Sequence, residues 1–151
     1  MVMSISVVTA TRAEYGLLSG LLKRIQLDAQ FNLRLIVTGT HLSPKFGCTF
    51  NEILADDLVI STSIPFSLDK DDAEFLTSSL GKALDLFGKE FADNTPDLLV
   101  ILGDRYEMLA PATAALMQKI PITHIHGGEQ TTGAIDNKIR HSITQMADYH
   151  M

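Results

Sequence analysis

The segment Pro96-Asp-Leu-Leu-Val-Ile-Leu-Gly-Asp-Arg-Tyr-Glu107 gives the strongest indication of the fold class. It opens with an unbroken apolar run, residues 98–102, which is typical of a parallel strand buried on both faces. Gly103-Asp104-Arg105 then ends the strand and leads into a helix expected to run to about Lys119. Pro111 falls inside that helix and predicts either a kink or a late start. The segment therefore indicates a strand followed by a helix, the repeating unit of a parallel α/β sheet.

The same alternation continues on both sides of this segment. Further strands are predicted over residues 5–9, 31–38, 58–64 and 121–125, and further helices over residues 11–25, 49–56, 73–87 and 136–147. This order predicts an α/β protein with a doubly wound parallel sheet, forming one Rossmann-like domain over residues 1–151. Residues 147–151 look like a helix running into a new strand, so we expect the sequence to be part of a longer protein.

Composition narrows the classes of partner. The 151 residues carry a net charge of -6, which argues against nucleic acid or an anionic membrane as a partner for the whole surface. Cys48 is the single cysteine, so no internal disulfide is expected and a reducing compartment fits. No basic region precedes the N-terminal apolar run, and the longest apolar run is too short for a bilayer. We expect a cytoplasmic protein.

Polar clusters follow four of the predicted strands. They are residues 9–14, 39–41, 103–107 and 124–129. Ligands of open parallel sheets bind outside the carboxyl ends of the strands, and all of these ends lie on one edge of the sheet. The sequence therefore predicts an active site at this edge.

The first cluster has the spacing of a capping box, in which Thr11 and Glu14 bond each other's backbone at a helix start. That structural role is the one we favour for Glu14. Arg12 is not needed for such a box, and a guanidinium beside a helix N-terminus suits a phosphate. The loop lacks a Gly-x-Gly-x-x-Gly pattern, so no nicotinamide or flavin dinucleotide is indicated.

The segment from Ile120 to Asp136 passes from an apolar strand into two histidines, two glycines and two carboxylates. Gly127 and Gly128 would let a ligand approach the backbone closely, and the titratable side chains suit proton transfer. The alternative is a glycine-rich turn whose Asp136 caps the next helix. Similarly, Asp104 is either a helix cap or a catalytic carboxylate. The His124-x-His126 spacing does not fit a zinc site, so no metal is predicted.

Five motifs, in order along the whole chain, resemble the hydrolysing UDP-N-acetylglucosamine 2-epimerases. They are Thr11-Arg-Ala-Glu-Tyr-Gly16, Val37-Thr-Gly-Thr-His-Leu42, Gly103-Asp-Arg-Tyr-Glu107, His124-Ile-His-Gly-Gly-Glu129 and Ile139-Arg-His-Ser-Ile-Thr144. The resemblance implies the N-terminal half of a GT-B-like two-domain fold, with the second nucleotide-binding domain absent from this chain. It also implies a homo-oligomer, either a dimer or a tetramer.

The reaction implied by the resemblance converts UDP-N-acetylglucosamine to UDP and N-acetylmannosamine, a step toward sialic acid. UDP is eliminated to give a glycal unsaturated between C1 and C2, and hydration from the other face inverts C2. No cofactor or metal is implied. Asp104 and Asp136 match catalytic carboxylates, whereas His126 stands where many members have a glutamate, with Glu129 as the nearest carboxylate that could compensate. The implied substrate-binding residues are Arg12, Tyr15, His41, Arg105, Gly127 and Gly128.

Three other functions stay open. A same-branch epimerase could act on a UDP-2,4-diacetamido-trideoxy sugar, for legionaminic-type acids, with residues 48–50 and 66–72 deciding the substrate. A GT-B glycosyltransferase half-domain would not need the acids of residues 124–136. A non-catalytic nucleotide-sugar-binding module is the third alternative.

Overall fold

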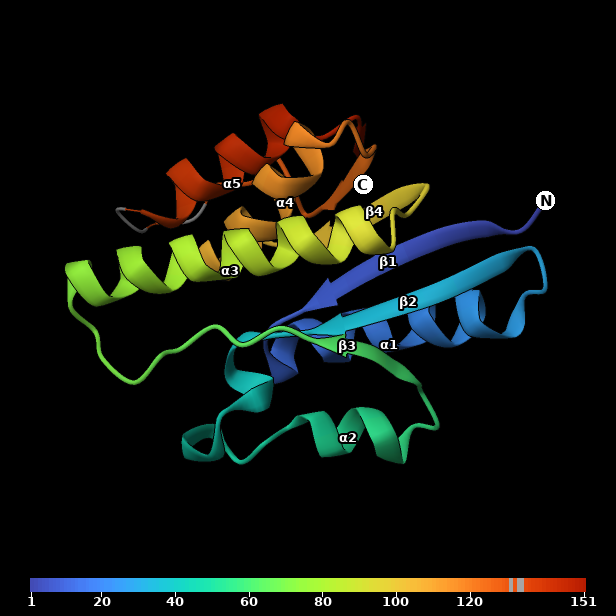
Figure 1. Cartoon of the computed structure of the whole chain (residues 1–151), viewed down its shortest axis with the longest axis horizontal. Helices are drawn as coiled ribbons and strands as arrows, with labels where there is room; N and C mark the ends of the chain where they lie inside the picture. Colours follow the sequence, from blue (N-terminus) through green and yellow to red (C-terminus); the bar gives the residue numbers. More distant parts are fainter. Residues whose placement is uncertain (131, 133–134) are drawn as a thin grey trace.

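The computed structural model describes residues 1–130, 132 and 135–151. Its six strands form one parallel sheet in the order β3-β2-β1-β4-β5-β6 (Figure 1). The strands are β1 (Met3–Thr9), β2 (Phe31–Val37), β3 (Ile60–Ser63), β4 (Leu98–Leu102), β5 (Ile122–Ile125) and β6 (Tyr149–His150). This order reverses between β1 and β4, as in Rossmann-type sheets. The predicted doubly wound parallel sheet is confirmed.

The helices cover both faces of the sheet (Figure 1). Helices α1 (Arg12–Leu27) and α2 (Phe50–Ala55) lie on one face, and α3 (Ala73–Asp93), α4 (Leu109–Met117) and α5 (Asp136–Met146) lie on the other. Short 3-10 helices occur at η1 (Gly39–Leu42), η2 (Pro44–Phe46) and η3 (Tyr106–Met108). No helix in the described part of the chain is both long and apolar enough to cross a membrane.

Each central strand contributes to two hydrophobic cores, one under each helical layer. In β1, Val7 packs toward α1 while Val8 packs toward α3. In β4, Leu99 and Ile101 face the α3 layer, and Val100 faces the α1 layer. Because fully burying one such side chain contributes about 1.5–3 kcal/mol, the unbroken apolar run is a direct result of burial on both faces.

The predicted effect of Pro111 is confirmed in the form of a late start. The chain first makes the 3-10 helix η3 after Arg105, and α4 begins only at Leu109. Pro111 therefore lies in the first turn of α4, where its missing N–H removes no intrahelical hydrogen bond.

Candidate active site

Backbone and side-chain hydrogen bonds join the loops that follow β1 and β2. The carbonyl of Ala10 accepts from the His41 N–H at 3.2 Å and from the Thr40 hydroxyl at 2.9 Å. Gly39 has φ +59°, and a Cβ there would lie 3.0 Å from the Ala10 carbonyl oxygen. Only glycine allows the two loops to approach this closely without strain.

A pocket of about 430 Å³ opens at the carboxyl edge of the sheet, where the chain leaves the neighbouring strands β1 and β4 toward opposite faces. This switch point is where ligands of doubly wound folds bind. The pocket is lined by Thr11, Thr40, Lys45, Phe46, Leu68, Asp69, Lys70, Asp71, Arg105 and Tyr106. Three cations and two carboxylates line it, a formal net charge of +1, so it suits an anionic group better than the net charge of -6 of the whole chain would suggest. Of the two loops expected to decide substrate fit, the 66–72 loop lines the pocket with residues 68–71, and residues 48–50 do not line it.

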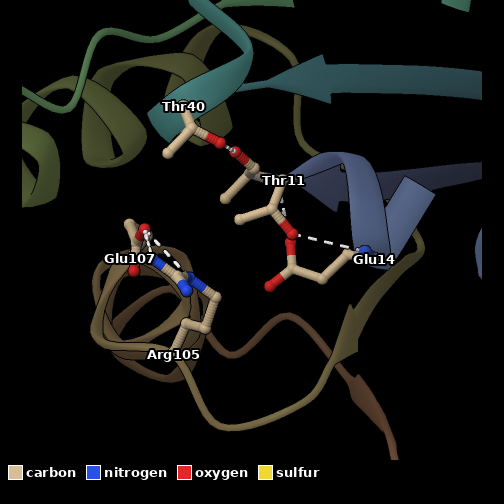
Figure 2. Close-up of polar contacts among 6 residues, drawn as sticks. Thr11, Glu14, Thr40, Arg105 and Glu107 are labelled. Atoms are coloured by element: carbon tan, nitrogen blue, oxygen red, sulfur yellow. Dashed lines mark hydrogen bonds and ion pairs between the residues drawn. The ribbon is translucent and has the colours of Figure 1, made fainter. Parts of the chain in front are cut away.

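The predicted capping box at the start of α1 is confirmed (Figure 2). The Thr11 hydroxyl accepts from the Glu14 N–H, and Glu14 Oε2 accepts from the Ala10 and Thr11 N–H groups at 2.9 and 3.2 Å. Glu14 is only 6% exposed. Burial raises the pKa of Glu14 to about 7, with the Ala10 hydrogen bond opposing the shift and the charge of Glu107 adding to it. Near neutral pH this carboxyl is therefore partly protonated.

We expect Glu14→Gln to change how stability depends on pH. Between pH 4.5 and about 7 the folded protein keeps the Glu14 proton while the unfolded chain releases it. Stability from the neutral carboxyl is thus present below pH 4.5 and lost as pH rises to about 7, a change of about 3 kcal/mol. Glutamine does not titrate, so relative to wild type the variant should gain unfolding free energy from pH 5 to pH 8. Urea unfolding at both pH values measures this, and a pH-independent difference would contradict it.

A chain of polar and charged side chains joins the loop after β5 to the loop after β4. His126 Nδ1 lies 2.9 Å from Glu129 Oε1, and Glu129 Oε2 lies 3.7 Å from Arg140 Nη1. Arg140 Nη2 donates to Asp104. Arg140 projects from α5 and is 8% exposed. Three of the four predicted catalytic residues are thus held in one network, and Arg140 is its buried centre.

The helix-cap alternatives for Asp104 and Asp136 are wrong. Arg105 is the N-cap residue of η3 and Ile135 that of α5, and neither helix has a side-chain cap hydrogen bond. Asp136 is the first residue of α5. Burial and the charge of Glu107 raise the pKa of Tyr106, which lines the pocket; the charge of Arg105 opposes the shift, and the charges of Asp71 and Asp136 add to it more weakly.

His124 connects the turn that carries Asp104 to helix α5 through hydrogen bonds of both ring nitrogens. Its Nε2 lies 2.7 Å from the Gly103 carbonyl, which can only accept, so this nitrogen carries the proton. Its Nδ1 then accepts from the Thr144 hydroxyl at 3.1 Å. A Cβ on Gly127 would lie 2.7 Å from that same Nδ1. Packing against His124 therefore requires a glycine at position 127.

The backbone of the following loop is strained at one position. His126 has φ +58°, a left-handed conformation that is uncommon outside glycine and tends to persist at functional sites. Gly128 has φ +76°, where glycine avoids such strain. Within residues 1–130, 132 and 135–151, no group of three or more His, Cys, Asp or Glu side chains is arranged to hold a metal.

Comparison with known proteins identifies the family. A family model described as UDP-N-acetylglucosamine 2-epimerase matches residues 23–151. The chain belongs to this family. It is 48% identical over 146 residues to a GDP/UDP-N,N'-diacetylbacillosamine 2-epimerase (hydrolyzing) of Campylobacter jejuni, covering 97% of this chain and 38% of the relative. It is 41% identical over 150 residues to a UDP-N,N'-diacetylbacillosamine 2-epimerase (hydrolyzing) of Legionella pneumophila, covering 99% and 40%.

Solved structures agree on the fold of this 2-epimerase-family chain. A UDP-GlcNAc 2-epimerase from Neisseria meningitidis, bound to UDP-GlcNAc, superposes with a TM-score of 0.82 at 18% identity, covering 99% of this chain and 39% of that one. A UDP-GlcNAc 2-epimerase from Methanocaldococcus jannaschii superposes with a TM-score of 0.80 at 20% identity, with coverages of 99% and 39%. The chain thus spans about two fifths of the length of these relatives.

Not every residue implied by the 2-epimerase resemblance reaches the pocket. Tyr15 is buried, and its hydroxyl donates to Asp56 beyond α2. His41 is buried between the hydroxyls of Thr9, at 3.0 Å, and Thr49, at 2.7 Å, and burial lowers its pKa to about 4. The Tyr15 and His41 side chains therefore hold neighbouring segments of the chain together and do not line the pocket.

The sequence indicated some residues at the site and missed others. Arg12 directly follows the lining residue Thr11 but is not among the residues that line the pocket; its side chain is 73% exposed, and its Nε donates to Glu52 Oε2 at 3.0 Å. Arg105 lines the pocket as predicted, whereas the lining residues Thr11 and Thr40 had no predicted ligand role. Arg140 and the buried pair Glu14 and Glu107 were likewise missed as members of the site. The only signal for Arg140 was its place in the last of the five motifs.

Proposed function

We propose that this chain is the N-terminal part of a hydrolysing UDP-sugar 2-epimerase. The observation that carries the proposal is the network from His126 through Glu129 and Arg140 to Asp104, whose neighbour Arg105 lines a pocket with a small excess of positive charge. Epimerisation by elimination needs a base for the C2 proton, an acid on the opposite face, and positive charge at the leaving diphosphate. A glycosyltransferase half-domain would not need such a set of acids and bases.

The contacts suggest how the groups share these roles. As UDP leaves C1 with the bonding electron pair, a base takes the C2 proton and a double bond forms between C1 and C2. Water then adds its hydroxyl to C1, and a proton returns to C2 from the other face. Asp104, Asp136 and His126 are our candidates for these transfers. The Glu129 carboxylate holds the Nδ1–H of His126, which leaves Nε2 free to accept a proton.

The diphosphate is assigned to the other side of the pocket. Lys45, Lys70 and Arg105 supply positive charge there, and the first backbone N–H groups of α1 point toward the same edge. Arg12, directly after the lining residue Thr11, is positioned to meet a phosphate once its pairing with Glu52 is given up. In the whole protein, we propose that a second nucleotide-binding domain closes over this pocket, that the enzyme is a homo-oligomer, and that it is cytoplasmic.

Two UDP-sugars are candidate substrates, UDP-N-acetylglucosamine and a UDP-2,4-diacetamido-trideoxy sugar. We favour the diacetamido sugar. Relatives named for diacetylbacillosamine are 48% and 41% identical to this chain, whereas the N. meningitidis UDP-N-acetylglucosamine 2-epimerase is 33% identical. Phe46, Leu68 and Tyr106 also give the pocket an apolar side that suits a 6-methyl group and a second acetamido group.

The test is UDP release from both sugars by the full-length protein, run in D₂O with NMR analysis of the sugar product. We expect the C2-inverted free sugar carrying deuterium at C2, and a kcat/KM at least about tenfold higher for the diacetamido sugar. Equal or reversed preference would return the substrate to UDP-N-acetylglucosamine. UDP release without deuterium at C2 would mean simple hydrolysis and would overturn the epimerase proposal.

A further inference from the structure

Arg105 is held by a carboxylate that is wholly buried. Glu107 is 0% exposed, and its Oε1 accepts from Arg105 Nε at 3.1 Å and from Arg105 Nη2 at 2.8 Å. Its other oxygen, Oε2, is buried and has no hydrogen-bond partner in the described part of the chain. A buried carboxylate with an unpartnered oxygen is unfavourable, so the pair is a strong candidate for a role beyond stability.

A second buried carboxylate approaches Arg105 from α1. Glu14 uses Oε2 for the capping box, while its Oε1 is buried and unpartnered among the described residues. Figure 2 shows this free oxygen pointing toward Arg105, with Glu107 on the other side of the guanidinium. Burial opposes the charge of Arg105, but the hydrogen bonds of Glu107 and the charges of Glu107 and Glu14 outweigh it and raise its pKa.

We infer that Glu107 is a positioning residue that holds the Arg105 guanidinium at the pocket wall, ready for an anionic group of the ligand, and that the charge of Glu14 modulates this arrangement. Of the five N–H groups of an arginine, Glu107 takes two, which leaves three for that ligand. A guanidinium fixed in this way loses little conformational freedom when it binds a phosphate. The inference rests on the proposed function in taking the diphosphate of a UDP-sugar as the anion.

The charge state of Glu14 tunes this arrangement. The ionised groups facing it are Arg105 and Glu107 from the loop and helix after β4, with the Ala10 and Thr11 N–H groups on its own side. Beyond Arg105, the pocket adds Lys45, Lys70, Asp69 and Asp71. With Glu14 neutral, Arg105 and Glu107 cancel each other, whereas an ionised Glu14 leaves the cluster with one excess negative charge. An incoming diphosphate therefore favours the protonated form of Glu14.

The first test compares Glu107→Gln with wild type in the full-length protein, using calorimetric binding of whichever of the two UDP-sugars wild type binds more tightly. We expect Kd to rise about tenfold, the order expected for losing one charge-assisted hydrogen bond that orients Arg105. Glu107→Asp, which keeps the charge, should recover part of the affinity. The matched control is Glu90→Gln, because Glu90 also pairs with an arginine, Arg34, at 2.6 Å but lies away from the pocket.

The possible results distinguish the positioning role of Glu107 from the proposed function. A lower melting temperature in Glu107→Gln with unchanged Kd would reduce Glu107 to a structural partner and overturn the inference, leaving the proposed function intact. If wild type bound neither UDP-sugar, both would fall. Equal losses of affinity in Glu90→Gln and Glu107→Gln would show a general effect of destabilisation and would also overturn the positioning role.

The second test follows Kd from pH 6 to pH 8. A UDP-sugar is the right probe because its diphosphate has no terminal group titrating in that range. In wild type, Kd should rise with pH around pH 7 as Glu14 ionises, and in Glu14→Gln this rise should disappear. The same pH dependence of Kd in both proteins would show that Glu14 has no effect on ligand binding at Arg105.

Discussion

Replacing Asp104 with asparagine should lower the turnover of the full-length enzyme by at least about 10²-fold, the low end for a lost general acid or base. Asp104 lies directly after the buried strand β4, at the edge of the sheet that carries the pocket, and it accepts from the buried Arg140. Asparagine keeps an oxygen that can accept from Arg140 but cannot transfer a proton. UDP release under saturating substrate measures the effect.

A control separates this loss from a general effect on the fold. Asp85→Asn removes a carboxylate that pairs with Lys89 on the exposed side of α3, at 2.7 Å, and should leave turnover unchanged. Circular dichroism should show both variants folded. Near-normal turnover in Asp104→Asn would mean that the carboxylate serves only to hold Arg140.

Arg140→Met should have the largest effect on stability, a loss of about 3–5 kcal/mol, because it breaks the ion pair between Asp104 and a nearly buried guanidinium. Arg140 is nearly inaccessible to solvent, and it bonds Asp104 across the gap between α5 and the end of β4. Urea unfolding measures the change. Lys89→Met, which breaks an exposed pair, is the comparison and should change stability by about 1 kcal/mol or less.

Combining Arg140→Met with Asp104→Asn tests whether the two residues act as a pair. Once the carboxylate has been neutralised, removing the arginine no longer breaks an ion pair with Asp104, so the double variant should be more stable than the sum of the single effects predicts. A coupling of about 1 kcal/mol or more is expected for residues in contact. Effects that add within about 0.5 kcal/mol would contradict the ion pair as a stabilising unit.

The sheet was predictable from the sequence because its signals are local. Burial of β4 on both faces dictates the apolar run of residues 98–102, and the capping box of Thr11 and Glu14 needs only residues three apart. The edge of the sheet that carries the pocket followed from the parallel order alone. These features depend on spacing within one element, which a single sequence shows.

The roles of particular side chains were less accessible because they depend on contacts between distant segments. Nothing near Arg140 in the sequence indicates that its partner is Asp104, 36 positions away. From the sequence, Glu107 is an ordinary acid at the start of a helix. Only the fold shows that Glu107 and Glu14 lie on two sides of the Arg105 guanidinium. Tyr15 and His41 carry polar groups in matching motifs, but the sequence does not show that these groups bond to Asp56, Thr9 and Thr49 and do not line the pocket.

The attachment of His126 to β6 has a mechanical consequence. The His126 N–H donates to the Met151 carbonyl at 2.8 Å, and the Met151 N–H donates to the His124 carbonyl at 3.0 Å. Two backbone hydrogen bonds therefore connect the loop after β5 to the end of the last strand. A sideways displacement of β6 by about 1 Å would carry the imidazole with it, and misplacements of that size can slow a reaction about 10²-fold. Residues 149–151 have no predicted catalytic or binding role, but through these hydrogen bonds their position influences the position of His126.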